Sequence, residues 1–583
     1  MPEENSLSYY INKSKDNTKG FERKIRIGLL SSYSINGLKE ILKVKSSERG
    51  ISCMIYETPY NQYSQEILNQ DSGIYKFLPE ITFLIIDTRN IFGELFRFPY
   101  SISISERKQF VAKKFHEIKN LIDKFVEKTN SKLVITKLNI PSFSPNGIFE
   151  SKIEYNFQEM IEDFNHKLLE NYLNSENTYV YDFEKFVAKN GEDNIFDYSQ
   201  FFFGDLKISI EYLPVFGHDL MKYVIGYLGI TKKCIVLDLD NTLWGGIVGE
   251  DGFNGIKLGP EPPGNTFMEF QRVLLSLHQR GIILAINSKN NFEDAIKVIK
   301  EHPYMILKED HFASIRINWK DKVTNMRELL QEINIGSDSL VFIDDDPVNR
   351  EFVKSIFPEI LVLDISNDPS TYASVIENVI DFSVLKITEE DKNRGKMYFK
   401  QKIINELEES TPDLQTFLSQ LDLKIIIKEV DEFTLPRVSQ LILKTNQFNL
   451  TTKRYQELDI EKMIQDPNFI VGCAQVGDKF GDNGITGVFI IKKENKEEWI
   501  IDSFLMSCRI MGRDIEKGIM TYIKNKAREN KVKRIKADFI QTQKNKPIEN
   551  FLPNCEFKEE EKSWTYTIKS EIKFPDYLSV KVE

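Results

Sequence analysis

The stretch CIVLDLDNTLWGGIVGEDG, residues 234–252, places an apolar run directly before two aspartates, Asp238 and Asp240. The apolar run predicts a buried strand of a parallel sheet, because such strands are covered on both faces. Ligands of open parallel sheets bind beyond the carboxyl ends of the strands, where both aspartates fall. The stretch therefore predicts an active site, although Asp240, Asn241 and Thr242 would also suit a turn held by side-chain to backbone hydrogen bonds.

Three later stretches favour the active site over the turn. Ser288 ends the predicted strand GIILAINS, Lys322 begins a predicted helix, and Asp344 and Asp345 end the predicted strand LVFIDD. Because the carboxyl ends of parallel strands meet at one sheet edge, we expect these side chains to gather there. Phosphoryl transfer needs a carboxylate nucleophile, donors for phosphate oxygens and oxygen ligands for Mg²⁺. The set predicts that chemistry.

Length and composition limit the class of protein. The chain has 583 residues, enough for two to four domains, and its formal net charge of -11 argues against nonspecific binding of nucleic acid or an anionic membrane. The five cysteines form no CxxC pair, so neither a disulfide framework nor a structural zinc is expected. The first residues lack the apolar core of a signal peptide, and no run reaches the roughly 18 apolar residues of a membrane span. We expect a soluble cytoplasmic protein.

Strand-like and helix-like segments alternate twice along the chain and then give way to longer strands after a charged helical segment. This order predicts an α/β fold with two Rossmann-like, doubly wound parallel-sheet domains followed by an α+β domain. The predicted domains are residues 1–225, 226–384 and 385–583. No flexible linker stands out between them, so we expect neighbouring domains to pack together.

The order DxDxT, Ser, Lys, DD over about residues 230–375 resembles the haloacid dehalogenase (HAD) superfamily of phosphotransferases. The resemblance implies that Asp238 attacks phosphorus and that Asp240 protonates the leaving group and later activates water. It further implies that Ser288 donates to the phosphoryl group and that Lys322 neutralises it. The implied Mg²⁺ ligands are Asp238, Asp344, Asp345 and the main-chain carbonyl of Asp240.

Two positions depart from the HAD pattern. Asp346 stands where the superfamily usually has asparagine, and Asp321 where it usually has proline. Lys320 is an alternative for the motif lysine, but the spacing from Trp319 to Asn325 favours Lys322.

The longer string VLDLDNTLWGGIVGEDG, together with NSKNN and SDSLVFIDDDP, resembles the FkbH-like branch of HAD subfamily IIIC. That resemblance implies loading of a glyceryl unit from 1,3-bisphosphoglycerate, a phosphorylated small molecule, onto the phosphopantetheine thiol of an acyl carrier protein, with removal of phosphate, in polyketide-type biosynthesis. The short connection between Asp238 and Ser288 leaves no room for a large lid, and an open site suits a carrier-bound group. The alternatives are a phosphatase acting on another phosphorylated metabolite or carrier-bound group, and a carrier-docking protein with a vestigial site.

The first domain resembles the N-terminal region of FkbH-like proteins, which is related to SGNH hydrolases. The hydrolase signature is incomplete: Ser31 and Ser32 replace the usual Gly-Asp-Ser, and His218 lacks an aspartate two residues upstream. A packing or docking domain is therefore favoured over a hydrolase.

The last domain resembles a GNAT-like acetyltransferase domain, whose pyrophosphate loop precedes a helix N-terminus. Here Arg509 and Gly512 keep part of that loop and Arg513 follows them, but Asp514 takes the last small position, which weakens the case for coenzyme A. The arginines would instead bind the phosphate of phosphopantetheine. A helix cap with solvated charges is an equally good interpretation.

Overall fold

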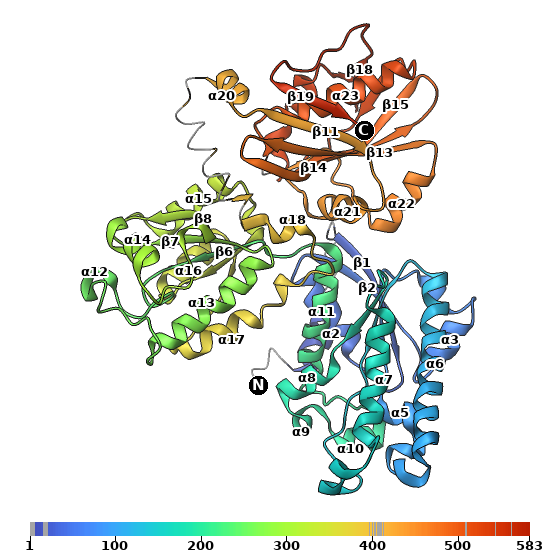
Figure 1. Cartoon of the computed structure of the whole chain (residues 1–583). Coiled ribbons are helices and arrows are strands. Elements are labelled where there is room, and N and C mark those ends of the chain that lie inside the picture. The colour runs from blue at the N-terminus through green and yellow to red at the C-terminus, as the bar shows by residue number, and fades with distance from the viewer. Residues whose placement is uncertain are drawn as a thin grey trace. The chain divides into compact units, whose positions relative to one another are not determined.

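The computed structural model describes residues 6–15, 21, 23–395, 397, 398, 400, 404, 411, 413–507, 510–542, 544–560 and 563–583. The chain forms two compact units, Met1–Val224 and Ile225–Glu583 (Figure 1). The sheets confirm the predicted fold class: two five-stranded parallel sheets are followed by a nine-stranded mixed sheet. The predicted boundary near residue 385 stays a prediction, because the second unit holds both of the later sheets.

The first sheet has the order β2-β1-β3-β4-β5. Its strand residues alternate between two helical layers, as the pleat requires. Leu84 packs in the cluster that contains α6 and α7 side chains, whereas the neighbouring Phe83 contacts Tyr223 of α11 on the other face. The strands are β1 (Arg23–Ser31), β2 (Ile51–Glu57), β3 (Ile81–Ile85), β4 (Lys132–Thr136) and β5 (Thr178–Tyr181). The helices of eight or more residues are α1 (Leu7–Lys15), α2 (Leu38–Ser47), α6 (Ile104–Lys128), α7 (Phe157–Tyr172), α8 (Phe183–Asn190) and α11 (Leu213–Leu228).

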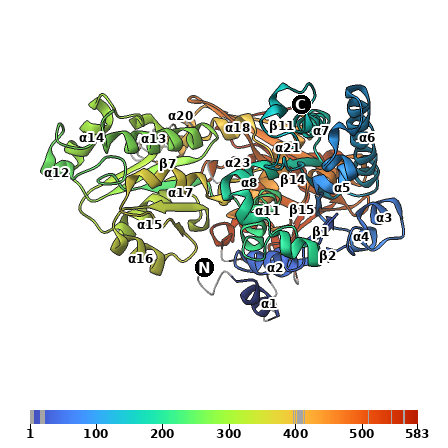
Figure 2. The ribbon, with the colours of Figure 1, turned by 90° about the horizontal axis from the view of Figure 1, so that it is seen from below.

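The second sheet has the order β10-β9-β6-β7-β8. Ile235 and Leu237 of β6 face the α13 side, whereas Cys234 and Val236 face the α15 side. Figure 2 shows α13 and α14 on one side of β7, and α15 and α16 on the other. The strands are β6 (Cys234–Leu237), β7 (Ile283–Ser288), β8 (Phe312–Ile317), β9 (Leu340–Ile343) and β10 (Leu361–Val362). The helices are α12 (Val248–Asp251), α13 (Gly264–Gln279), α14 (Phe292–Glu301), α15 (Lys322–Ile333), α16 (Pro347–Ile356) and α17 (Tyr372–Glu377).

The third sheet runs β17-β18-β16-β15-β14-β13-β11-β19, with β12 paired to β15. Its two faces pack against α23 and against α21 with α22. The strands are β11 (Leu423–Glu429), β12 (Phe448–Asn449), β13 (Phe469–Asp478), β14 (Gly481–Lys493), β15 (Glu498–Met506), β16 (Arg534–Ala537), β17 (Lys558–Glu560), β18 (Ser563–Thr567) and β19 (Leu578–Val582). The helices are α20 (Leu414–Gln420), α21 (Leu435–Lys444), α22 (Glu457–Gln465), α23 (Ile515–Glu529) and α24 (Phe551–Asn554).

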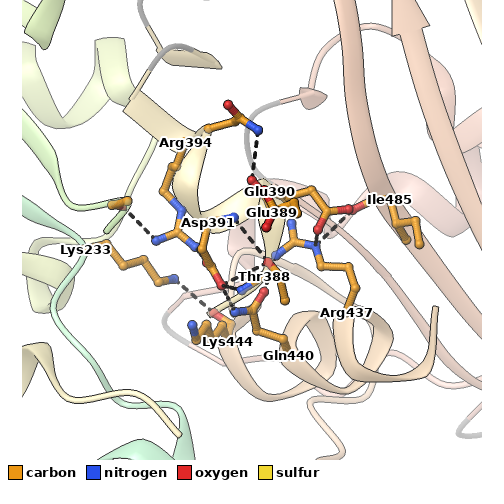
Figure 3. A network of polar contacts seen from close by, with 12 residues as sticks. Lys233, Thr388, Glu389, Glu390, Asp391, Arg394, Arg437, Gln440, Lys444 and Ile485 are labelled. Atoms are coloured by element: carbon orange, nitrogen blue, oxygen red, sulfur yellow. Dashed lines mark hydrogen bonds and ion pairs between the residues drawn. The ribbon is translucent and has the colours of Figure 1, made fainter. Parts of the chain in front are cut away.

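Helix α18 (Glu389–Lys392) lies in the charged segment between the second and third sheets, and Asp391 is its buried anchor. The Asp391 carboxylate forms an ion pair with Arg394 and accepts a hydrogen bond from Gln440 of α21 (Figure 3). Arg394 also donates to the carbonyl of Gly281, just before β7, across 3.1 Å. Gly281 has φ +96°, and a Cβ there would lie 2.0 Å from the Asp391 carbonyl oxygen. The segment therefore contacts both the turn before β7 and helix α21.

Opposing effects act on the Asp391 carboxyl. Burial disfavours its charged form, but the positive charges of Arg394 and Lys444 outweigh that effect and hold the pKa of Asp391 well below its usual range. Burial is the largest effect on Lys444 and lowers its pKa to about 7, although the charge of Asp391 opposes that shift.

Candidate active site

The carboxyl ends of β6, β7 and β9 bring three of the predicted stretches side by side. Leu237 pairs with Ile286 of β7 and with Ile343 of β9, and the Asp238 N–H donates to the Ile343 carbonyl across 3.0 Å. Asp238 therefore lies between the residues that follow β7 and those that follow β9. The pairing of the apolar strand β6 with β7 and β9 sets this position of Asp238, as expected for a parallel sheet.

Lys322 is the positive charge at the centre of the site. Its Nζ lies 2.7 Å from Asp238 Oδ1 and 2.9 Å from Asp344 Oδ2, and it donates to the Asn287 carbonyl across 2.7 Å. The Asn287 amide donates back to the Lys322 carbonyl. Burial lowers the pKa of Lys322, but the two carboxylates raise it more, so the net shift is upward and the ammonium stays charged.

Helix α15 carries Lys322 at its first residue, and Asp321 caps that helix by accepting a hydrogen bond from the Thr324 N–H at 2.9 Å. The aspartate that departs from the usual proline thus starts the helix by another means. Lys320 points elsewhere: its ammonium pairs with Glu328 at 2.7 Å, and its side chain is 55% exposed. The structure therefore brings Lys322, and not Lys320, among the carboxylates.

Three carboxylates form a group suited to a divalent cation. Asp238, Asp344 and Asp345 each offer an oxygen, and these oxygens lie within 4.8 Å of one another. One ammonium faces three acids, so the group carries excess negative charge. Burial, followed by the charges of Asp238 and Asp344, raises the pKa of Asp345 to about 6. Oxygen ligands, excess negative charge and close spacing fit Mg²⁺.

Asp240 lies outside this group of side chains, in the loop that follows β6. Its Oδ1 accepts hydrogen bonds from the Trp244 indole at 2.8 Å and the Val248 N–H at 3.1 Å, and its Oδ2 accepts from Asn290 at 2.8 Å. Burial raises the pKa of Asp240, and the Val248 N–H opposes that shift. The metal contact predicted for Asp240 is through its main-chain carbonyl, and it stays a prediction. The Asp240 side chain is not part of the group of three carboxylates, and its pKa is raised, which suits a proton donor.

Ser288 is 1% exposed at the last position of β7. Within the described part of the chain, its hydroxyl has no hydrogen-bond partner. A buried hydroxyl without a partner remains available to a ligand. The connection from β6 to β7 contains only α12 and α13, so no lid domain is inserted there.

Sequence reasoning missed several residues that hold the site together. Trp244 and Asn290 position Asp240, Asn287 positions Lys322, and Arg350 donates to the carbonyls of Asp344 and Asp345 at 2.9 and 2.8 Å. Asn287 and Asn290 belong to the stretch NSKNN, and two amides beside Ser288 were the available signal. No comparable signal marked Arg350.

The predicted phosphate-binding residues of the last domain are only partly described. Arg509 lies outside the described residues. Gly512 has φ +82° just before α23, consistent with a tight turn. Arg513 forms a buried ion pair with Asp478 at 3.0 Å, and Asp514 accepts hydrogen bonds from Lys517 and Tyr577. A phosphate contact by Arg513 stays a prediction, and it would have to compete with Asp478.

The two serines of the incomplete hydrolase signature both accept backbone hydrogen bonds. The Ser32 hydroxyl accepts from the Asp87 N–H at 2.9 Å, and the Ser31 hydroxyl from the Tyr33 N–H at 3.3 Å. His218 lies in α11. A structural role for the serines accounts for these contacts.

The second sheet and its group of carboxylates around a lysine have the arrangement expected from the resemblance to HAD phosphotransferases. Residues 26–225 match the model of the FkbH N-terminal domain family. The chain is similar to the solved N-terminal part of protein BF1531 from Bacteroides fragilis, which contains a phosphatase domain complexed with Mg. That match has 26% identity and a TM-score of 0.60, and it covers 66% of this chain and 100% of the other.

Shorter matches reach GNAT-type structures. Rv2747 from Mycobacterium tuberculosis, solved with CoA, is 16% identical with a TM-score of 0.19, covering 23% of this chain and 72% of its own. The ribosomal-protein-S18-alanine N-acetyltransferase of Escherichia coli is 9% identical with a TM-score of 0.20, covering 26% and 99%. At these scores the matches carry no inference about a ligand. Comparison with curated protein sequences found no significant match. Among the described residues, no helix is long and apolar enough to cross a membrane.

Proposed function

We propose that this protein is a Mg²⁺-dependent phosphotransferase of the HAD type whose nucleophile is Asp238. The observation that carries the proposal is the buried ammonium of Lys322, placed between Asp238 and Asp344 with Asp345 beside them. The solved Bacteroides fragilis relative, with its phosphatase domain and Mg, supports the same chemistry.

The residues of the site divide the reaction between them. An Asp238 oxygen attacks phosphorus while the leaving group takes a proton from Asp240, whose raised pKa favours the protonated form. Asp240 then accepts a proton from the water that hydrolyses the aspartyl phosphate. The Ser288 hydroxyl and the Lys322 ammonium bind phosphoryl oxygens. Bound Mg²⁺, held by Asp238, Asp344 and Asp345, would offset the negative charge of the phosphoryl group.

We further propose that the phosphorylated group is a glyceryl unit from 1,3-bisphosphoglycerate, loaded onto the phosphopantetheine thiol of an acyl carrier protein. This finer proposal rests on the resemblance of the extended aspartate stretch to FkbH-like proteins and on the match over residues 26–225. The absence of a lid domain between β6 and β7 supports it, because a carrier-bound group needs an open approach.

Intact mass of a holo acyl carrier protein tests both levels of the proposal. The carrier is incubated with this protein, Mg²⁺ and 1,3-bisphosphoglycerate, and compared with reactions that contain Asp238→Asn. We expect a glyceryl-sized gain with the native chain and the phosphorylated form of that gain with the variant. Asp310→Asn is the matched control, because the Asp310 side chain is 68% exposed outside the site, and it should behave as the native chain.

Two other outcomes would assign a different function. Phosphate release from small phosphoesters that is indifferent to the carrier, with no mass gain, would indicate a phosphatase of another metabolite. Tight carrier binding without any Mg²⁺ binding would indicate a docking protein with a vestigial site. Phosphate release that survives Asp238→Asn would exclude Asp238 as the nucleophile.

A further inference from the structure

The first unit contains a cavity that the proposed reaction does not use. It has a volume of about 470 Å³ including its opening to solvent. Its walls include Asp87 and Arg89 after β3, Asn139 after β4, and the segment 192–207. In parallel sheets, the carboxyl ends of the strands are where ligands bind.

Two arginines of this cavity are held by aromatic rings instead of by carboxylates. The Arg89 guanidinium lies 4.4 Å from the ring centre of Phe201, and that of Arg97 lies 4.4 Å from Phe143. Both also lie over Phe96, at 5.3 and 5.4 Å. Within the described part of the chain, neither guanidinium group forms an ion pair or a hydrogen bond. Stacking fixes the planar groups and leaves their N–H edges available.

The acidic residues that line the cavity are already engaged. Asp87 forms an ion pair with Lys207, Glu192 accepts from the Ser142 N–H at 2.8 Å, and Asp197 caps α10 (Tyr198–Gly204) through the Gln200 N–H at 3.0 Å. Glu192 and Asp197 accept backbone N–H groups but form no ion pair with a described residue. The formal charges of the lining residues cancel, but the acidic side chains have polar partners and the two guanidinium groups have none in the described part of the chain. Among the described lining residues, the two guanidinium groups are the charged groups with neither an ion pair nor a hydrogen bond.

Asn139 provides a second, independent sign of a ligand. The residue is 5% exposed, and its carbonyl accepts from the Thr88 hydroxyl at 2.6 Å. Its side-chain amide has no hydrogen-bond partner among the described residues. An amide without protein partners keeps its donor and acceptor groups available to whatever occupies the cavity. Asn139 lines the cavity, so a bound molecule can satisfy it.

The chemistry of the lining indicates binding without hydrolysis. The described lining residues include no serine, cysteine or histidine, and the one hydroxyl in contact with Asn139, that of Thr88, is committed to a backbone carbonyl. Phenylalanine rings supply the apolar wall. We propose that this cavity is a binding site for a small organic oxyanion, a carboxylate or a phosphate joined to an apolar body, with Arg89 and Arg97 on the anion and Asn139 on a neutral polar atom.

Isothermal titration calorimetry on the full chain tests the proposal. The probes are phenyl phosphate and phenylacetate as aryl oxyanions, inorganic phosphate and acetate as the bare anions, and benzyl alcohol as the neutral counterpart. A chelator keeps divalent cations from the carboxylate group of the second unit. We expect both aryl oxyanions, or one of them, to bind better than the bare anions and better than benzyl alcohol. The preference between phosphate and carboxylate identifies which anion the site takes.

Arg89→Gln and Arg97→Gln should each weaken binding of the aryl oxyanion about tenfold, because each removes a charge-assisted contact. Arg97 is exposed, so its variant should fold even if Arg89→Gln does not. Lys114→Gln is the matched control, because Lys114 lies over Phe110 on α6 and does not line the cavity. Ser288→Ala should also bind normally, which separates this cavity from the proposed phosphoryl-transfer site.

Three results would overturn the proposal. They are binding of benzyl alcohol as tight as that of the aryl oxyanions, unchanged affinity in both arginine variants, and absence of binding by every anion of the series. None of them would bear on Asp238 and its proposed reaction.

Discussion

The indole of Trp244 donates a hydrogen bond to Asp240 Oδ1. The loop after β6 therefore folds back onto Asp240, which lies near the start of that loop. Trp244 is fully buried and Asp240 is half-buried, so the contact is partly shielded from water. A hydrogen bond to the charged form of a carboxyl lowers its pKa, which opposes the upward effect of burial on Asp240. The strength of the proposed general acid is thus set partly by one tryptophan.

Replacing that donor should shift the pH dependence of turnover. In Trp244→Phe the Asp240 carboxyl loses a donor to its charged form, so its pKa rises and it stays protonated to higher pH. We expect the alkaline limb of the kcat/KM profile to move to higher pH. In Trp319→Phe the limb should not move, because the Trp319 indole donates to Asn291 and its side chain is exposed. A shift of the limb to lower pH would show that Trp244 does not stabilise the Asp240 anion.

Lys322 should contribute far more to stability than Lys320. Lys322→Met leaves Asp238 and Asp344 buried without their counter-ion, and breaking buried pairs of this kind costs about 3–5 kcal/mol. Lys320→Met removes an exposed pair with Glu328, worth about 1 kcal/mol or less. Urea unfolding without Mg²⁺ measures both changes. Equal losses of unfolding free energy would contradict the central place given to Lys322.

Metal-free protein should lose stability as the pH rises from about 4 to about 6. Burial and the neighbouring acids raise the pKa of Asp345 to about 6, whereas an unfolded aspartate titrates near 4. Between these two pH values the folded state binds more protons than the unfolded state. The stability contributed by protonated Asp345 is therefore fully present below about pH 4 and is lost as the pH rises to about 6. Thermal unfolding over this range should show the loss.

Mg²⁺ and Asp345→Asn provide the controls for that pH effect. Mg²⁺ should offset the loss above pH 6, because it binds the ionised folded site. Asp345→Asn should flatten the dependence, since the titrating group is gone. A metal-free stability that rises steadily with pH and is unchanged in the variant would contradict the assignment.

The aspartate of the connecting helix should be required for stability at neutral pH. Asp391→Asn removes the counter-ion of Arg394, and we expect a loss of about 3–5 kcal/mol. Because the pKa of Asp391 is held low, its contribution is present above the unfolded pKa near 4 and is lost as the pH falls. Denaturant unfolding of native and variant chains should therefore converge in acid.

Glu389→Gln is the matched control for Asp391→Asn. The Glu389 side chain is 80% exposed, and its pair with Lys392 lies on the surface of the same helix. Its removal should change the unfolding free energy by less than about 1 kcal/mol. An equally large loss of unfolding free energy in Glu389→Gln would show that any substitution in α18 destabilises the chain, whether or not it removes a buried contact.

The sequence was sufficient for the parts of the site that follow from strand patterns. Buried apolar strands are recognisable, and residues directly after them must lie at one sheet edge, so the sequence placed Asp238, Ser288 and Asp344 at that edge. Their roles stay predictions. Lys322 required the choice of a helix start, which the cap by Asp321 explains only after folding.

Contacts that depend on loops or on distant strands were not accessible in this way. Trp244 reaches Asp240 only because a glycine-rich loop folds back, and Arg513 meets Asp478 from another strand. Arg89 and Arg97 could not be predicted as binding residues, because the sequence does not show that phenylalanines of three separate segments will stack on them.

Strand β19 pairs in parallel with β11, although every other strand of the third sheet lies between them in the sequence. During translation, β11 therefore leaves the ribosome long before this neighbour exists. Until β19 docks, β11 forms one edge of the growing sheet, and unpaired edge strands favour pairing with other chains. The rate at which β19 is synthesised and docked thus sets how long β11 of a nascent chain stays without this partner.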